Sequence, residues 1–146
     1  LLDTAKRDGH HAAVQTAAAS QLGRMVLVMA QRSGYPIIHV VRRDTQVKLL
    51  ESMDAAHVLN SSDEGFPEQL RSACGQLGVT AAFEAVGGEV TGTILNSMPP
   101  GSIAYVYGAL SGDPCSDIDP IELIFQGKSV RGFYLVLQHH FGIGVF

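Results

Sequence analysis

Hydrophobic positions along the chain follow two alternating patterns. Short runs of apolar and β-branched residues are typical of buried strands, whereas apolar residues three and four positions apart indicate an amphipathic helix. The segment 20–34 shows the helical spacing and ends on a glycine, a typical helix stop. We therefore predict a helix over 20–34 in which Met25, Val26 and Met29 face the core.

The same alternation extends over the rest of the chain. Strands are predicted at residues 11–17, 35–41, 56–60, 79–86, 102–110 and 128–137. Further helices are predicted at 44–53, 67–77 and 88–98, with Asp44 or Thr45 as the N-cap of the first of these, and a short apolar turn at 121–125. Strands separated by helices form right-handed βαβ units. The pattern thus predicts an α/β fold, a Rossmann-type doubly wound parallel sheet of six strands in the order 3-2-1-4-5-6.

Composition narrows the classes of function. The 146 residues fit one domain, and 46% hydrophobic against 16% charged residues indicates a large buried core. The net charge of −4 argues against a nucleic-acid-binding surface. No apolar run reaches the ~18–20 residues that span a bilayer, and residues 1–11 lack the layout of a signal peptide. We expect a cytoplasmic protein with no nucleic-acid or membrane partner.

Several common sites lack the residues they need. Cys74 and Cys115 are 41 residues apart without a CxxC pair, so we predict neither a zinc site nor a disulfide. The histidine pairs at 10–11 and 139–140 are adjacent rather than at helical metal-site spacing, and no metal is predicted. A short-chain dehydrogenase requires a tyrosine followed four residues later by a lysine, and the sequence has no such pair. The sequence also lacks the Gly-Lys-Ser/Thr phosphate loop of an NTPase.

The junction between the first predicted strand and helix is a candidate phosphate-binding turn. Set against the pattern G-x-G-x-x-G, residues 18–23 read AASQLG, so that only Gly23 is kept. Ala18 and Ser20 are small replacements that hinder but do not block the approach of a pyrophosphate. The helix dipole and free N–H groups persist whatever the side chains, and Ser20 can cap the helix or bind a phosphate oxygen. Taken alone, this turn fits an ordinary strand-to-helix connection equally well.

Two arginines follow the second predicted strand. NAD-binding domains place Asp or Glu about twenty residues beyond the glycines, against the ribose 2′-hydroxyl. The residue 19 positions after Gly23 is Arg42, followed by Arg43. Arginines here suit the 2′-phosphate of NADP(H), through charge-assisted hydrogen bonds and stacking on adenine. The alternative is a pair of solvated arginines at a helix entry, and the position favours the NADP(H) interpretation.

Five ordered segments carry a family resemblance: VQTAAASQLGRM, VVRRDTQVKLL, HVLNSS, FEAVGG and VYGALSG. They resemble the cofactor domain of medium-chain dehydrogenases/reductases, especially the quinone oxidoreductase-like members of the zinc-type alcohol dehydrogenase superfamily, over residues 1–135. The resemblance implies that Ala19, Ser20, Gln21 and Leu22 face the pyrophosphate, and that Gly23 belongs to the same cofactor-binding turn, where it allows close packing of helix on strand. It implies that the 2′-phosphate and adenine contact Arg42, Arg43, Gln46, Asn60 and Ser61, although relatives often carry a basic residue in place of Gln46. It places the middle of the cofactor against Ala85, Val86 and Gly87, and the nicotinamide end against Tyr107, Gly108, Ala109 and Phe133.

The function implied by the resemblance is that of an NADP(H)-binding domain in a reductase that transfers hydride from NADPH to a quinone or enone. The family's substrate domain has no counterpart in this sequence. We therefore expect residues 1–146 to be a single domain excised from a two-domain enzyme and inactive alone, with catalytic residues unassigned. The small-molecule acceptor would bind through the missing domain, and an exposed sixth strand would permit a homodimer. Residues 136–146 do not match the helix expected after that strand.

Two other functions stay open at this point. One is a non-catalytic nucleotide-binding module that senses redox state. The other is an S-adenosylmethionine-dependent methyltransferase, which usually carries an acid where this chain has Arg42 and Arg43.

Overall fold

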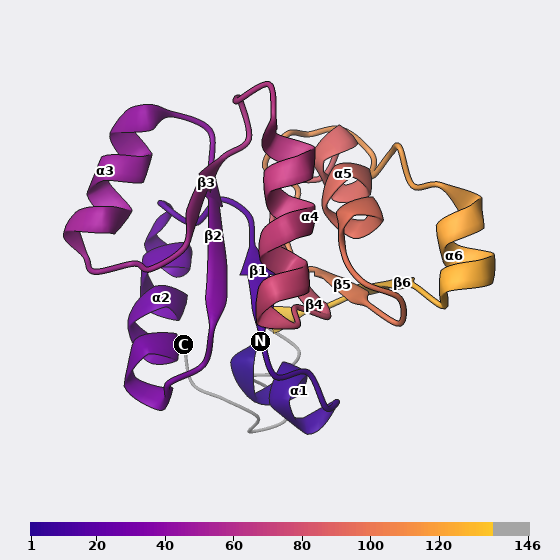
Figure 1. Ribbon diagram of the computed structural model, residues 1–146, viewed down its shortest axis with the longest axis horizontal. Helices are drawn as coiled ribbons and strands as arrows, with labels where there is room; N and C mark the ends of the chain where they lie inside the picture. Colours follow the sequence, from indigo (N-terminus) through magenta and orange to yellow (C-terminus); the bar gives the residue numbers. More distant parts are fainter. Residues whose placement is uncertain (136–146) are drawn as a thin grey trace.

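Six parallel strands form one sheet in the computed structural model, which describes residues 1–135 (Figure 1). The strands are β1 (Ala13–Gln15), β2 (Ile37–Val41), β3 (Val58–Asn60), β4 (Ala81–Glu84), β5 (Ile103–Val106) and β6 (Ser129–Gly132). Their order, β3-β2-β1-β4-β5-β6, confirms the predicted doubly wound Rossmann-type sheet. Chain order reverses between β1 and β4, so the loops that follow β1, β2 and β4 meet at one edge of the sheet.

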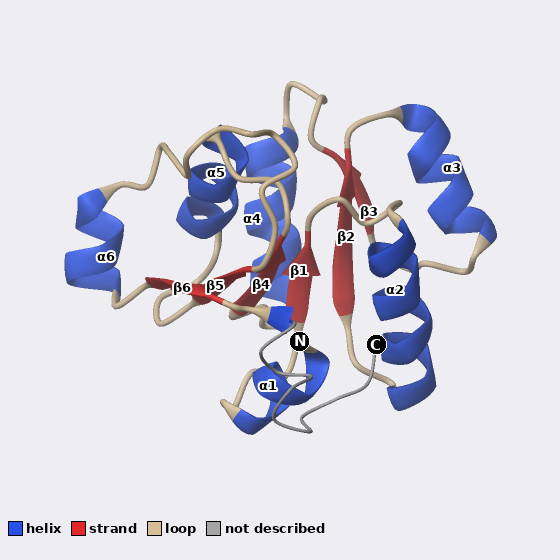
Figure 2. Ribbon diagram, turned by 180° about the vertical axis from the view of Figure 1, so that it is seen from behind, coloured by secondary structure: helices blue, strands red, loops and turns tan. Residues whose placement is uncertain are grey.

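Helices cover both faces of this sheet (Figures 1 and 2). They are α1 (Leu2–Arg7), α2 (Gln21–Ser33), α3 (Asp44–Ser52), α4 (Phe66–Leu77), α5 (Glu89–Ser97) and α6 (Pro120–Gln126). On one face, Leu70 of α4 and Ile94 of α5 pack on the strands with Val14 and Ile38. On the other face, α1 and α2 pack against Phe83 and Tyr105, among others. None of the helices formed by residues 1–135 is long and apolar enough to cross a membrane.

The buried face of α2 differs from the predicted one. Met25 and Met29 are 46% and 54% exposed, so their assignment to the core was wrong, whereas Val26, Leu27 and Ala30 are buried. The apolar run from Met25 to Ala30 is continuous, and the spacing alone therefore left the orientation of the helix ambiguous. Gly23 lies on the same buried face as these three residues and approaches the backbone of Ala17 and Ala18 closely, so the two methionines point outward.

The N-cap predicted for α3 was also wrong. The helix starts at Asp44, with Arg43 in the capping position and no side-chain cap. The carboxylate of Asp44 instead accepts a hydrogen bond from the Asn60 side-chain amide, 2.9 Å away, at the end of β3. This bond ties the loops after β2 and β3 together.

The C-terminal elements are shorter than predicted. β5 ends at Val106 because the chain then turns over the loop after β4, and β6 ends at Gly132; positions 136–137 of the predicted strand lie outside the described residues. The predicted apolar turn is the helix α6, whose N-cap Asp119 accepts a hydrogen bond from the N–H of Ile121. No residue of α6 is buried, and every residue of β6 is exposed. Both thus border the open edge of the sheet.

Both cysteines are free, with Cys74 buried and Cys115 exposed.

Candidate functional site

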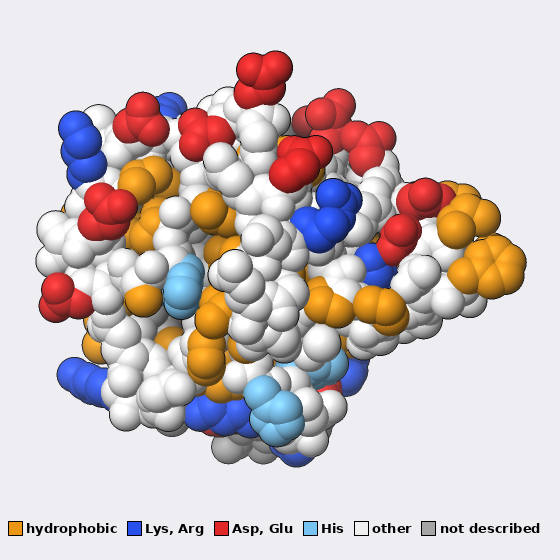
Figure 3. Space-filling model, viewed as in Figure 1, with side chains coloured by type: hydrophobic (Ala, Val, Ile, Leu, Met, Phe, Trp, Pro, Cys, Tyr) orange, Lys and Arg blue, Asp and Glu red, His pale blue; other side chains and the backbone are white. Residues whose placement is uncertain are grey.

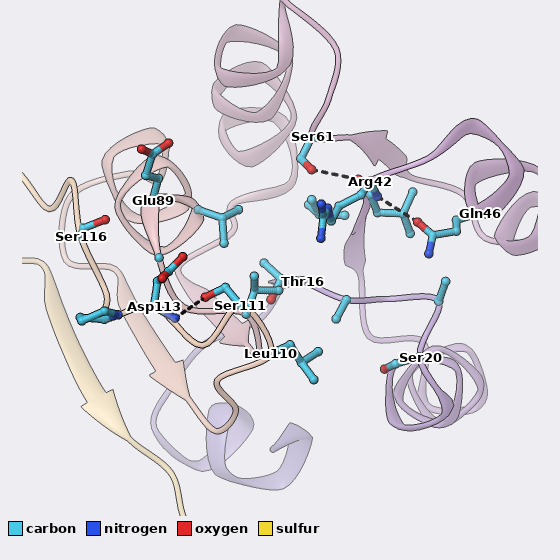
Figure 4. A pocket seen from close by; sticks show the side chains of 18 residues that line it. Thr16, Ser20, Arg42, Gln46, Ser61, Glu89, Leu110, Ser111, Asp113 and Ser116 are labelled. Carbon is cyan, nitrogen blue, oxygen red and sulfur yellow. Dashed lines mark hydrogen bonds between the residues drawn. The ribbon is translucent and has the colours of Figure 1, made fainter.

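A cavity lies where the loops after β1, β2 and β4 meet (Figure 4). Its volume of about 870 Å³ falls within the range of ligand and cofactor pockets. The residues that line it are Thr16, Ala17, Ala19, Ser20, Val40, Val41, Arg42, Gln46, Ser61, Val86, Gly88, Glu89, Val90, Leu110, Ser111, Asp113, Pro114 and Ser116. This is the reversal point of the strand order, where doubly wound sheets bind their ligands.

The turn between β1 and α2 presents a helix N-terminus to this cavity. The Ser20 hydroxyl caps α2 by accepting a hydrogen bond from the N–H of Gly23 at 3.1 Å, which confirms the predicted cap. The first bond of the helix runs from Arg24 N to the Ser20 carbonyl. Within the described residues, the N–H groups of Gln21 and Leu22 thus stay available to solvent or to a ligand. No acidic residue stands in the first turn of α2, so its positive end is not neutralised locally.

Close packing explains the single retained glycine. A Cβ atom on Gly23 would lie 2.5 Å from the carbonyl oxygen of Ala18 and 2.6 Å from that of Ala17. Ala17 itself adopts a positive φ of 49°, an uncommon conformation for a non-glycine residue. The turn is tight enough to require glycine at the helix, yet it accommodates alanine and serine at the positions that face the cavity.

The loop after β2 supplies the basic side of the cavity. Arg42 and Gln46 both line it, and the Gln46 side-chain oxygen accepts a hydrogen bond from the backbone N–H of Arg42 at 3.1 Å. Ser61 lies beside them and donates its hydroxyl to the Val41 carbonyl. Arg43 is exposed and does not line the cavity, and Asn60 is buried, with its side chain bonded to Asp44 and to Ser62 N. The structure thus separates Arg42 from Arg43, which the sequence treated as a pair.

A carboxylate that the sequence analysis did not select lies below the loop after β4. Glu84 is fully buried, and its two oxygens accept four hydrogen bonds. The donors are the hydroxyls of Thr16 and Thr91 and the backbone N–H groups of Val86 and Gly87, at 2.6–2.9 Å. The available signal was an acid at the end of the otherwise apolar strand 79–86. Val86 lines the cavity, whereas Ala85 and Gly87 shape the loop behind it.

The chain after β5 folds across this loop. Gly108 is required there, because a Cβ on it would lie 2.8 Å from the Ala85 carbonyl oxygen. Ser111 N donates to the Val86 carbonyl at 2.8 Å, and Ser116 N donates to the Gly88 carbonyl at 3.1 Å. Residues 110–116 therefore form one wall of the cavity, which the sequence analysis missed because nothing in that loop indicated where it folds.

Other predicted site residues do not line the cavity and lie on the face of the sheet that α1 and α2 cover. Leu22, Tyr107 and Phe133 pack against the core cluster that contains Tyr105, and the rings of Tyr105 and Phe133 meet edge to face with centroids 6.3 Å apart. Burial, reinforced by the nearby Glu84, raises the pKa of Tyr107 to about 12. Ala109 does not line the cavity. Of the predicted site residues, the structure thus brings together at the cavity Ala19, Ser20, Arg42, Gln46, Ser61 and Val86.

Charge is distributed unevenly around the cavity. Arg42 and Gln46 stand on one side, and Glu89 and Asp113 on the other (Figure 4). Residues 1–135 contain no group of three or more His, Cys, Asp or Glu residues placed to hold a metal ion; His139 and His140 lie outside the described residues.

Comparisons of the sequence and of the structure with known proteins indicate the same family. Residues 22–142 match the family model described as zinc-binding dehydrogenase. The structure of a candidate NADPH:quinone reductase from Mesorhizobium loti superposes with a TM-score of 0.86 at 36% identity, over 94% of this chain and 40% of that one.

Curated relatives point to the same group. The 2-haloacrylate reductase of a Burkholderia species is 26% identical over 84% of this chain and 35% of its own length. The mitochondrial enoyl-[acyl-carrier-protein] reductase of Arabidopsis thaliana is 28% identical over 84% of this chain and 33% of its own length. The chain therefore spans about a third of the length of these relatives. Because the family model matches most of the chain and the sheet has the expected order, the chain belongs to the zinc-binding dehydrogenase family of medium-chain oxidoreductases and represents its nucleotide-binding fold.

Proposed function

We propose that this chain is the NADP(H)-binding domain of a medium-chain reductase. One observation carries the proposal: Arg42 and Gln46 line the same cavity as the capped N-terminus of α2. A guanidinium group suits a 2′-phosphate, and a helix start without acidic residues suits a pyrophosphate. The relation to a chain described as an NADPH:quinone reductase supports the same cofactor.

The residues present fit a dinucleotide in size and in chemistry. Ser20 holds the helix start open toward the cavity, so that Gln21 and Leu22 can donate their N–H groups to phosphate oxygens. Arg42 would bind the 2′-phosphate, while the hydrogen bond from its backbone N–H to Gln46 keeps the loop in place. The predicted contacts outside the cavity stay predictions; they include Arg43, Asn60, Tyr107 and Gly108. Of these outer residues, Tyr107 and Phe133 would contact the nicotinamide half of the cofactor, beyond the edge of the sheet.

When bound, NADPH supplies the hydride, and this chain positions and shields it. The acceptor would be a quinone or an enone, by analogy with relatives described as a quinone reductase, a 2-haloacrylate reductase and an enoyl-[acyl-carrier-protein] reductase. We propose that its binding site and its proton donor come from the parts of a longer enzyme that correspond to the remaining two thirds of the relatives.

A homodimer through β6 is part of the same proposal. β6 is an edge strand with all its residues exposed, and α6 beside it exposes Ile124 and Phe125 at 68% and 73%. Hydrophobic side chains gather at the protruding end of the molecule where α6 lies (Figure 3). Unpaired strand edges and apolar patches are typical of surfaces that associate, and a second copy offers a matching edge.

Titration of NADPH, NADH and S-adenosylmethionine against the purified chain tests the cofactor proposal. We expect NADPH to bind more tightly than NADH, and Arg42→Ala to weaken NADPH binding by about ten- to a hundredfold, as for a lost charge-assisted hydrogen bond. Arg43→Ala should have a smaller effect, and Arg71→Ala, in the exposed part of α4, none. Equal affinity for NADH and NADPH, or preferential binding of S-adenosylmethionine, would refute the proposal.

A further inference from the structure

Glu84 places a buried carboxylate directly beneath the loop after β4. It is fully buried, and among the described residues no lysine or arginine forms an ion pair with it. All its hydrogen-bond partners donate: the Thr16 hydroxyl at 2.9 Å, Val86 N at 2.7 Å, Gly87 N at 2.9 Å and the Thr91 hydroxyl at 2.6 Å. In other loop-to-helix turns, donors of this kind bind the oxygens of a phosphate.

Helices α2 and α5 both begin at the cavity, and they differ in charge. α2 has no acid in its first turn, and Ser20 caps only the N–H of Gly23. α5 has Glu89 in its first turn and Glu84 behind the preceding turn, whose N–H groups at Val86 and Gly87 are already engaged. Carboxylates near a helix N-terminus offset its dipole and repel other anions. The two helix starts are therefore not equivalent toward a phosphate.

Glu84 is also coupled to a residue that lines the cavity. Thr16 follows β1; its hydroxyl donates to Glu84 and accepts from the N–H of Ala85 at 2.9 Å. This reciprocal pair joins the loop after β1 to the loop after β4 across the reversal point of the sheet. Any change at Glu84 would thus reach the cavity floor through Thr16 and through Val86.

We infer that Glu84 is a specificity-determining residue that acts as an internal anion. It occupies the anion-binding groups of the β4–α5 turn and repels phosphate from it, so that the pyrophosphate of a dinucleotide binds at α2 only. This inference rests on the proposed function. It adds to that function by assigning which of the two helix N-termini, α2 or α5, holds the pyrophosphate of the cofactor. Glu84 itself touches no ligand and positions the loops that do.

Amide NMR of the full chain with inorganic pyrophosphate as the probe reads the anion position directly. In the unaltered protein we expect pyrophosphate-dependent shifts at Gln21 and Leu22 and none at Val86 and Gly87. In Glu84→Gln the side-chain NH₂ would face two donors, the turn would be released, and shifts should appear at Val86 and Gly87 as well. NADPH should then bind about tenfold more weakly, because one unsatisfied hydrogen bond costs about that factor.

Thr91 provides a second variant in case Glu84→Gln does not fold. Thr91 does not line the cavity, and Thr91→Val removes the bonds of its hydroxyl to Glu84 and to the Cys115 thiol, 3.5 Å away. We expect it to weaken NADPH binding about threefold, whereas Thr91→Ser should behave as the unaltered protein. Thr93→Val is the matched control, because its hydroxyl bonds only to the Glu89 carbonyl on the same helix. If Glu84 had only a structural role, these variants would change the melting temperature but not the set of amides that shift with pyrophosphate, which we call the anion map.

The outcomes separate this inference from the proposed function. Pyrophosphate shifts at Val86 and Gly87 in the unaltered protein would overturn the inference, and so would the absence of any shift. A folded Glu84→Gln variant that still binds pyrophosphate at α2 alone would overturn it too. If NADPH binds the unaltered protein in these cases, the proposed function stands. If the anion map is as expected but NADPH does not bind, the proposed function fails while the role of Glu84 in directing anions is supported.

Discussion

The α-carbon of Gly23 faces the backbone of Ala18 so closely that a Cβ atom would lie 2.5 Å from the Ala18 carbonyl oxygen. Because the obstacle is backbone rather than a flexible side chain, the structure must shift to admit alanine. We predict that Gly23→Ala lowers the free energy of unfolding by about 2 kcal/mol, the typical cost of an overpacked site. It should also weaken NADPH binding, since α2 would move away from the turn. Urea denaturation followed by circular dichroism measures the first effect, and ligand titration the second.

Gly75 provides the matched control for this prediction. It lies exposed within α4, and a Cβ there would meet nothing within 4 Å. Gly75→Ala should therefore raise the free energy of unfolding by about 0.5–1 kcal/mol through helix propensity alone. If both substitutions had the same effect, close packing would not be the reason for Gly23.

A charge introduced at Gln46 tests the place of the 2′-phosphate. Glu has nearly the shape of Gln and keeps the acceptor for the Arg42 N–H, at present 3.1 Å away. Gln46→Glu would add a negative charge to the side of the cavity that Arg42 makes basic. We expect NADPH affinity to fall about tenfold and NADH affinity to change little, because only NADPH carries the extra phosphate. Isothermal titration at two salt concentrations measures this, and an equal loss for both cofactors would place the 2′-phosphate elsewhere.

The sequence was most informative where a residue acts on its neighbours in the chain. The alternation of apolar segments predicted the strand order, and Ser20 predicted the cap of α2, because periodicity and capping are local properties. Arg42 could be placed in the site by counting from Gly23, since the length of one βα unit is nearly fixed.

Long-range packing set the limits of prediction. Arg43 differs from Arg42 only in the direction of its side chain, which the start of α3 decides. Glu84 bonds to Thr16, 68 positions earlier, and the wall at residues 110–116 is held by Val86 and Gly88. Such contacts leave no periodic signal, so the sequence analysis selected none of these features beyond the family motifs.

A lysine at Val130 tests the proposed dimer. Val130 is 38% exposed on the edge strand β6, where a charge discourages strand pairing. We expect the unaltered chain to sediment as a dimer and Val130→Lys as a monomer in analytical ultracentrifugation. Met29→Lys is the control, because Met29 is an exposed apolar residue on α2, away from this edge. A monomer at every concentration in the unaltered chain, or a dimer that tolerates Val130→Lys, would contradict the proposal.

His39 gives the protein an acid-sensitive interior. It is 4% exposed, and its Nδ1 atom accepts a hydrogen bond from the Gln15 side-chain amide at 2.8 Å, which requires the neutral ring. Burial, with a smaller contribution from His57, lowers the pKa of His39 to about 4. Between that value and the ordinary pKa of about 6.5, the unfolded chain binds a proton that the folded chain does not.

Stability should therefore be fully present above pH 6.5 and decrease as the pH falls toward 4. A difference of 1.4 kcal/mol per pKa unit predicts a loss of about 2 kcal/mol between pH 6.5 and pH 5. His39→Gln should remove most of this slope, with a remainder from His10, whose pKa burial also lowers. His57→Gln, on the exposed side, should keep most of it. Urea unfolding at pH 8, 6.5 and 5 measures the slope, and an undiminished slope in His39→Gln would show that other groups cause the acid sensitivity.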